Sequence, residues 1–283
     1  MIAVDVLISV DELAQALSAP LPRILDVRWT LAEPDGRAAY LAGHIPGAVY
    51  VDLDGELSDH SVRDGGRHPL PTPALLQRAA RRWGLRPGES VVAYDDWNGQ
   101  AAARAWWLLR AAGVTDVRIL DGGWSAWQRA GLPTETGQVT PEPGTLRVDS
   151  LDNLPAVNAD TIAVQADSPD HLVLDARAAE RSRGEVEPLD PRAGHIPGAV
   201  SAPTAQNLTP EGLFRSATDL RQRFAALGAD TAPVTVYCGS GVTATHQIAA
   251  LAIAGFDAAL FPGSWSQWST DPARPVATGP DPR

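Results

Sequence analysis

The chain is internally duplicated, and this duplication is the sequence feature that most constrains its fold. "ILDVR" at 24–28 returns as "VLDAR" at 173–177, and "AGHIPGAV" at 42–49 returns unchanged at 193–200. Eight identical residues of mixed type are very unlikely to recur by chance. Because self-similarity at a fixed period marks a repeated structural unit, we expect two domains of similar fold rather than one large domain.

Two further pairs of segments follow in the same order, again about 140 to 150 residues apart. "VVAYDD" at 91–96 parallels "VTVYCG" at 234–239, and "DGGWSAW" at 121–127 parallels "PGSWSQW" at 262–268. The kept order and the slow drift in spacing are typical of duplicated domains whose loops have changed in length.

The stretch "GLPTETGQVTPEPGTLRV" at 131–148 contains Pro, Gly and Thr and lacks a helical period. It therefore has the character of a linker. We predict an N-terminal domain over residues 1–135, a linker over 136–155 and a C-terminal domain over 156–283.

Short apolar runs alternate with helical patterns in each half. The runs around 23–28, 91–96, 171–177 and 233–239 are typical of buried strands that end in polar residues. Helices are predicted over 72–85, 100–113, 216–228 and 241–256. This alternation indicates an α/β fold with a mostly parallel central sheet flanked by helices in each half, and in such sheets sites lie at the carboxyl ends of strands.

Composition narrows the class of partner. With 34 acidic and 23 basic side chains, the net charge of −11 disfavours nucleic acid or an anionic membrane as a partner. No run of about 20 apolar residues predicts a spanning helix, and the N-terminus does not resemble a signal peptide. The single cysteine excludes an internal disulfide. Together these features predict a cytoplasmic protein.

The only cysteine, Cys238, follows an apolar β-branched run and precedes a predicted helix that begins near Val242 or Thr243. A helix N-terminus favours negative charge and lowers the pKa of a thiol. Gly239 and Gly241 leave their amide groups unobstructed, and Ser240 and Thr243 add hydroxyl donors. The pattern favours a stable thiolate, or a larger anion bonded to the sulfur, over a buried structural cysteine. In the first half the equivalent residue is Asp95, which cannot act as a thiolate, so we expect that half to be catalytically silent.

On these motifs the sequence resembles tandem-domain rhodanese-type sulfurtransferases over nearly its whole length. The resemblance rests on "CGSGVTA" at 238–244, both "GHIPGA" segments, "LDARAAERSRGEVEP" at 174–188, and the "GGW" and "GSW" segments. It implies two tandem rhodanese-like domains, of which only the C-terminal one is catalytic. It also implies that the Cys238 thiolate takes the sulfane sulfur of a donor as a persulfide and passes it to cyanide or a thiol, by ping-pong kinetics.

The resemblance assigns roles to the loop after the cysteine and implies no cofactor or metal. Cys238 and Ser240 are the catalytic candidates. The loop that surrounds the persulfide consists of Gly239, Gly241, Val242, Thr243 and Ala244. The partners implied are a small-molecule sulfur donor and a cyanide or thiol acceptor, a protein thiol among them.

The choice of donor depends on the same loop. In this family "CRKGVTA"-like loops accompany thiosulfate and "CGSGVTA"-like loops accompany 3-mercaptopyruvate. Residues 239–244 carry no cation for the thiosulfate dianion, so 3-mercaptopyruvate is the expected donor and thiosulfate the rival. A module that only relays a persulfide between proteins is a further alternative. A cysteine-dependent phosphatase is disfavoured because Ala244 stands where its phosphate-gripping arginine is required.

Four substrate-binding residues are implied by position. Arg181 matches the first arginine that binds the donor carboxylate, a group that the planar guanidinium fits well. Arg192 is the candidate for the second and Arg183 the alternative, because this segment is two residues shorter than the family pattern. From the first half, Asp59 and His68 match polar residues that line the cleft.

Other polar residues have structural interpretations. The twin His44 and His195, and the strand-ending Asp26 and Asp175, occur in both halves although only one half has the thiol. We therefore interpret them as structural. His246 is a weaker candidate for a general base.

Overall fold

The computed structural model describes residues 5–17 and 21–282, and their contacts divide into two compact units. The N-terminal unit comprises the chain up to Asp59, together with Leu70–Leu154 and Glu211–Leu213. The C-terminal unit comprises His60–Pro69, Pro155–Pro210 and the chain from Phe214 on. The short segment 60–69 therefore belongs, by its contacts, with the second repeat.

The N-terminal unit has a parallel five-stranded sheet in the order β1-β5-β4-β2-β3. Its described elements are β1 (Leu7–Ile8), α1 (Val10–Ala16), β2 (Arg23–Asp26), α2 (Arg37–Ala42), β3 (Val49–Tyr50), α3 (Leu53–Glu56), α4 (Pro73–Arg82), β4 (Val91–Tyr94), α5 (Gln100–Ala111), β5 (Val117–Leu120) and α6 (Gly123–Arg129).

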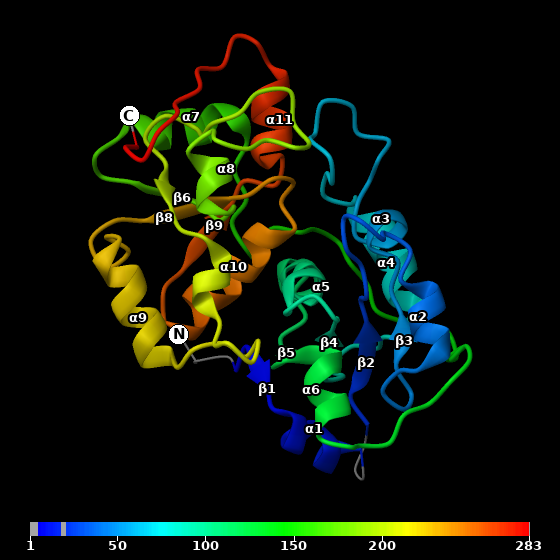
Figure 1. The fold of residues 1–283 in the computed structure, drawn as a ribbon. Helices are drawn as coiled ribbons and strands as arrows, with labels where there is room; N and C mark the ends of the chain where they lie inside the picture. The colour runs from blue at the N-terminus through cyan, green and yellow to red at the C-terminus, as the bar shows by residue number, and fades with distance from the viewer. Residues whose placement is uncertain (1–4, 18–20, 283) are drawn as a thin grey trace. The chain divides into compact units, whose positions relative to one another are not determined.

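The C-terminal unit has a parallel four-stranded sheet in the order β7-β6-β8-β9. Its described elements are α7 (Ala159–Asp167), β6 (Leu172–Asp175), α8 (Ala179–Ser182), β7 (Val200–Ser201), the 3₁₀ helix η1 (Thr204–Asn207), α9 (Ala217–Ala226), β8 (Val234–Tyr237), α10 (Thr243–Ile253), β9 (Ala258–Leu260) and α11 (Ser264–Thr270). Figure 1 shows both units along the chain.

The predicted strands and helices form where local chemistry favours them. Central strands β4, β6 and β8 are buried along their whole length, as expected for parallel strands covered on both faces. Helix α4 begins after Thr72, whose side chain accepts a hydrogen bond from the Leu75 amide, with Pro73 in its first turn. Ser216 caps α9 in the same way. The α/β class predicted from alternation is confirmed.

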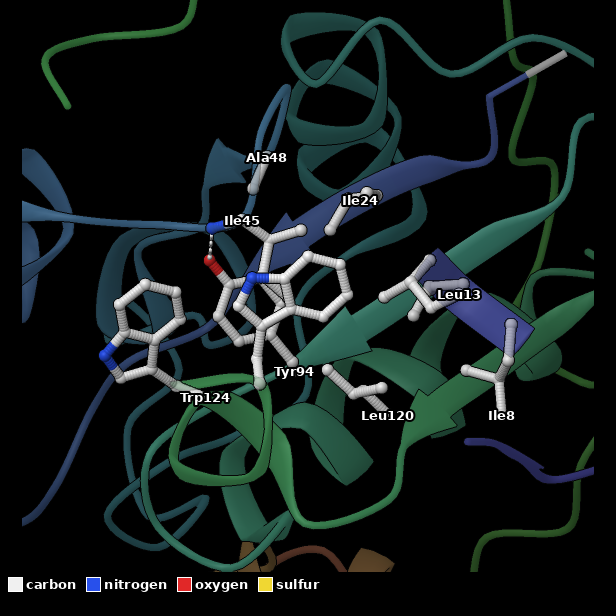
Figure 2. Close-up of a cluster of buried hydrophobic side chains, with 10 residues drawn as sticks. Ile8, Leu13, Ile24, Ile45, Ala48, Tyr94, Leu120 and Trp124 are labelled. Carbon is white, nitrogen blue, oxygen red and sulfur yellow. Dashed lines mark hydrogen bonds between the residues drawn. The ribbon is translucent and has the colours of Figure 1, made fainter. Parts of the chain in front are cut away.

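The core of the N-terminal unit packs beside its sheet. Figure 2 shows Ile8, Leu13, Ile24, Leu120 and Tyr94 as members of one buried cluster. The Tyr94 hydroxyl accepts a hydrogen bond of 3.2 Å from the Ile45 amide, so a fully buried aromatic ring keeps its polar atom satisfied.

The stretch predicted as a linker packs in part against the N-terminal unit. The amide of Leu146 donates to the Leu85 carbonyl, and Leu146 and Val148 are buried. Among the residues that the structure describes, no helix is both long and apolar enough to cross a membrane.

Candidate active site

Cys238 is positioned by the strand before it and the helix after it. Strand β8 ends at Tyr237 and α10 begins at Thr243, as the sequence predicted, so the thiol lies at the carboxyl end of a central strand. We call residues 238–244 the cysteine loop. Only 2% of Cys238 is exposed, so the thiol is buried.

Polar groups of the cysteine loop and of α11 surround the sulfur. The Gly241 amide donates to Sγ of Cys238 at 3.2 Å, and Oγ of Ser264 lies 4.0 Å from Sγ. The Ser264 hydroxyl also accepts from the Cys238 amide at 3.1 Å. At the start of α11, the Trp265 amide donates to the Cys238 carbonyl. The amide of Gly241 and the hydroxyl of Ser264 thus place two hydrogen-bond donors at the sulfur.

The path of the loop requires a glycine at position 241. Gly241 has φ +78°, and a Cβ there would lie 2.4 Å from the Pro262 carbonyl oxygen. A side chain would therefore be strained and would also collide with backbone. Gly239 differs, because a Cβ there would meet only side-chain atoms at ordinary contact distance, the nearest at 3.5 Å.

The structure brings two of the predicted site residues together. Nδ1 of His68 lies 2.8 Å from Oγ of Ser240, and both side chains are buried. His68 belongs to the segment 60–69, which packs within the C-terminal unit. A hydroxyl held by an imidazole can pass a proton to or from a bound molecule.

Two guanidinium groups lie beside Gly239. A Cβ on Gly239 would be 3.5 Å from Nη2 of Arg67 and 3.7 Å from Nη1 of Arg181. Arg181 was expected here, whereas sequence reasoning missed Arg67. The available signal was a cation directly before His68 in "GGRHP", within a segment already assigned to the cleft.

The two arginines share a carboxylate. Nη1 of Arg67 lies 2.8 Å from Oδ1 of Asp190, and Nη2 of Arg181 lies 3.4 Å from Oδ2 of the same residue. Glu187 pairs with Arg181 at 2.6 Å and with Arg177 at 3.3 Å. The side chains of Asp190 and Glu187 are 3% and 4% exposed, so both carboxylates are buried constituents of the site.

Arg192 has a different environment from the one expected of a substrate-binding residue. Its guanidinium donates to four backbone carbonyls at and after the end of α11, those of Trp268, Ser269, Asp271 and Arg274. These contacts occupy most of its donors and satisfy helix-end carbonyls. A donor carboxylate would have to compete with these carbonyls for Arg192, and the substrate-binding role of Arg192 stays a prediction.

The alternative Arg183 also has another contact. It pairs with Glu185 at 2.7 Å on the surface. Asp59 is half-buried and belongs to the N-terminal unit, and its role stays a prediction. In the cysteine loop Val242 and Ala244 are buried and Thr243 is half-buried at the first position of α10.

The twin strand-end aspartates have the structural role that both halves suggested. Asp175 accepts from Nε and Nη2 of Arg177, at 3.0 and 2.7 Å, and Tyr237 donates to it at 3.0 Å. Burial opposes ionisation of Asp175, but the contact with Arg177 outweighs burial and holds the pKa of this carboxyl below its ordinary value. Asp26 and Arg28 repeat the pair in the N-terminal unit.

The other three histidines considered as candidates each contact a polar group of their own unit. Nδ1 of His44 contacts the Tyr40 carbonyl and Nδ1 of His195 contacts the Ser182 carbonyl. His246 lies on α10, stacked on Phe214 and 2.6 Å from the Thr204 hydroxyl.

In the N-terminal repeat, the loop equivalent to the cysteine loop begins at Asp95, whose carboxyl group accepts hydrogen bonds from backbone amides. Oδ1 of Asp95 accepts from the amides of Trp97 and Gly99 at 2.7 and 2.9 Å, and Oδ2 accepts from Ala102 at 2.8 Å. Burial raises the pKa of Asp95, whereas these amides oppose the rise. In the N-terminal repeat, a strand–loop–helix junction thus directs main-chain donors at a buried carboxyl group.

Comparison with known families agrees with this geometry. The rhodanese-like domain family matches residues 9–130 and 158–271, which is most of the chain in two copies. The chain belongs to the rhodanese family.

Several members of this family are similar to the chain over nearly the full length of both proteins. A Mycobacterium tuberculosis protein whose name assigns it to the thiosulfate sulfurtransferases, SseB, is 52% identical over 97% of this chain and 98% of its own. A Pseudomonas aeruginosa protein whose name assigns it to the 3-mercaptopyruvate sulfurtransferases is 48% identical over 96% and 98%. The crystal structure of the 3-mercaptopyruvate sulfotransferase SseA from Escherichia coli superposes with a TM-score of 0.81 at 35% identity, over 93% of this chain and 99% of that one. By family, the protein is a sulfurtransferase with two rhodanese domains.

Proposed function

We propose that the protein moves a sulfane sulfur from 3-mercaptopyruvate to cyanide or a thiol through a persulfide on Cys238. The observation that carries this proposal is the sulfur atom itself, at the carboxyl end of β8 and hydrogen-bonded by the Gly241 amide at 3.2 Å. Asp95 supports it, because the equivalent loop of the other repeat directs three backbone amides at the carboxyl oxygens of that residue.

The first half-reaction forms an S–S bond and breaks a C–S bond. The Cys238 thiolate attacks the sulfur of the donor, and the electron pair of the C–S bond leaves as the enolate of pyruvate. The proton of the donor thiol ends on the methyl carbon of pyruvate, so Cys238 keeps a persulfide anion. Cyanide then takes the outer sulfur as thiocyanate, or a thiolate takes it as a new persulfide, and the Cys238 thiolate returns.

His68 and Ser240 fit the leaving group of this donor. The negative charge develops on the carbonyl oxygen of the departing enolate, and a hydroxyl donor beside it stabilises that charge more than the ground state. The Ser240 hydroxyl, held by His68 at 2.8 Å, takes this role. Arg181 takes the donor carboxylate.

The second candidate donor is thiosulfate, and two observations favour it. The M. tuberculosis relative at 52% identity is named for it. Moreover, Arg67 and Arg181 lie against Gly239. Residues outside the cysteine loop therefore supply the positive charge that the loop sequence lacks. Transfer from thiosulfate breaks its S–S bond and releases sulfite, a leaving group that requires no proton.

The test compares both donors with cyanide as acceptor. We expect a higher kcat/KM with 3-mercaptopyruvate, and a preference for thiosulfate of about tenfold or more, equal to about 1.4 kcal/mol, would overturn the donor assignment. Cys238→Ser should abolish transfer from both donors while circular dichroism stays unchanged. Mass spectrometry of donor-treated protein should show one added sulfur in wild type and none in the variant; turnover retained by Cys238→Ser would refute the mechanism.

A protein that only relays persulfides is distinguished by the same assay. Such a carrier would gain one sulfur from the donor yet turn over poorly with cyanide. A protein thiol as acceptor is included in the proposal and would appear as discharge of the loaded Cys238 by a thiol-bearing protein.

A further inference from the structure

The strongest unassigned feature is the buried carboxylate that bridges the two arginines at the cysteine loop. We propose that Asp190 is a specificity-determining residue, which offsets the positive charge of Arg67 and Arg181 and so favours a singly charged donor over a dianion. This inference rests on the proposed sulfur transfer and concerns how that site discriminates between donors.

The two arginines that Asp190 bridges lie beside Gly239. Arg67 and Arg181 come within 3.5 and 3.7 Å of the Cβ that Gly239 lacks, and Gly239 directly follows the thiol. A side chain at Gly239 would point toward the two guanidiniums. The two guanidiniums therefore occupy the space that a cationic side chain at position 239 would fill. An anionic donor that reaches Cys238 approaches both of them.

Among the residues that the structure describes, Nε of Arg67 and Nε of Arg181 are both buried and make no hydrogen bond. A buried N–H without a partner costs free energy, and two of them on neighbouring guanidiniums favour an incoming oxyanion. The side chains keep 26% exposure at Arg67 and 20% at Arg181, so an anion reaches the guanidiniums through their exposed atoms.

The charges of the ion-pair cluster around Asp190 balance. Arg67, Arg177 and Arg181 contribute three positive charges, and Asp175, Glu187 and Asp190 contribute three negative ones. A monoanionic donor such as 3-mercaptopyruvate leaves this cluster with one excess negative charge, whereas the thiosulfate dianion leaves it with two. Because Asp190 is 3% exposed, water screens its repulsion of the second charge only weakly.

The side chain of Asp190 can be changed without changing its shape. Asp190→Asn keeps an oxygen acceptor for Arg67 and removes one negative charge. We expect kcat/KM with thiosulfate to rise relative to kcat/KM with 3-mercaptopyruvate by about tenfold. Asp190→Glu, which restores the charge, should return the ratio toward the wild-type value. Asp170→Asn, the same charge change at an exposed residue, should leave the ratio unchanged.

Arg67→Gln tests the same electrostatics with the opposite sign. It removes a positive charge and should lower kcat/KM with thiosulfate more than with 3-mercaptopyruvate. Inhibition by sulfate, a dianion that transfers no sulfur, provides a second readout: its Ki should fall in Asp190→Asn and rise in Arg67→Gln. If Asp190→Asn does not fold, an unchanged donor ratio and sulfate Ki in Arg67→Gln would still overturn the proposed electrostatic role.

The outcomes separate this inference from the proposed function. If wild type transfers no sulfur from either donor, the proposed function fails. If wild type transfers sulfur but both variants keep the wild-type donor ratio and sulfate Ki, the role of Asp190 is refuted while sulfur transfer stands. Equal losses with both donors would refute it as well, since they would mark Asp190 as structural only.

Discussion

Nδ1 of His68 lies 2.8 Å from Oγ of Ser240 in the cysteine loop. The two residues are far apart in the sequence, and the contact exists because segment 60–69 packs within the C-terminal unit. The contact holds the Ser240 hydroxyl two residues after the thiol. In the proposed reaction this hydroxyl donates a hydrogen bond to the carbonyl oxygen of the donor.

Ser240→Ala and His68→Gln should each impair transfer from 3-mercaptopyruvate selectively. We expect kcat/KM with this donor to fall about 100-fold, because hydrogen bonding to the enolate oxygen is lost. The loss with thiosulfate should stay below about tenfold, since sulfite leaves without a proton. Steady-state assays with both donors and cyanide measure the difference. His60→Gln, a neighbouring exposed imidazole, is the matched control, and equal losses with both donors would contradict the assigned role.

The two glycines of the cysteine loop should differ sharply in their tolerance of alanine. Gly241→Ala places a Cβ 2.4 Å from the Pro262 carbonyl oxygen at φ +78°, so we expect it to lower the free energy of unfolding by about 1–3 kcal/mol. Gly239→Ala meets only ordinary contacts and should stay within about 0.5 kcal/mol of wild type. Urea denaturation measures both, and similar values for the two variants would show that the loop path is not set by Gly241.

Much of the fold was predictable because it depends on local sequence. The buried runs before Asp26, Asp95, Asp175 and Cys238 are apolar and β-branched, and each is followed by polar or glycine residues, so the strands and the position of the thiol follow from pattern alone. The internal repeat in the sequence predicted a second domain of the same fold.

The contacts of the arginines were not predictable in the same way. Arg192 and Arg181 look alike in the sequence, and only the tertiary structure shows that Arg192 donates to carbonyls at and after the end of α11 while Arg181 lies beside Gly239. Arg67 and Asp190 contact each other across a long sequence separation, and nothing in the periodicity of either segment specifies that pairing. An insertion or deletion of two residues changes which side chain points into a site without changing the motif around it.

Arg192→Ala should therefore affect stability rather than donor binding. Its guanidinium satisfies four carbonyls, and their loss should lower the free energy of unfolding by about 2 kcal/mol. KM for 3-mercaptopyruvate should change less than about twofold. Arg181→Ala is the matched comparison and should raise this KM about tenfold or more. A large rise in KM in Arg192→Ala with unchanged stability would instead restore Arg192 as a substrate-binding residue.

The buried pair of Asp175 and Arg177 should make the stability of the C-terminal unit depend on pH. Asp175→Asn leaves the Arg177 charge without its main partner, so we expect the free energy of unfolding at pH 7 to fall by about 3 kcal/mol. The pKa of Asp175 is lowered in the folded protein, whereas an unfolded aspartate titrates near pH 3.9. Between these two pKa values the unfolded chain binds more protons than the folded one, so the stabilisation is lost as pH falls.

The difference in unfolding free energy between wild type and Asp175→Asn should accordingly stay constant from about pH 8 to pH 5 and shrink below about pH 4. Urea titrations at several pH values measure it, with the exposed Asp170→Asn as control for the loss of one charge. A difference that instead grows as pH falls would mean that folding raises the pKa of Asp175, so that burial rather than the Arg177 contact dominates there. In that case the strand end beside the cysteine loop would hold a protonated acid, and the balance of three positive and three negative charges at the site would no longer hold.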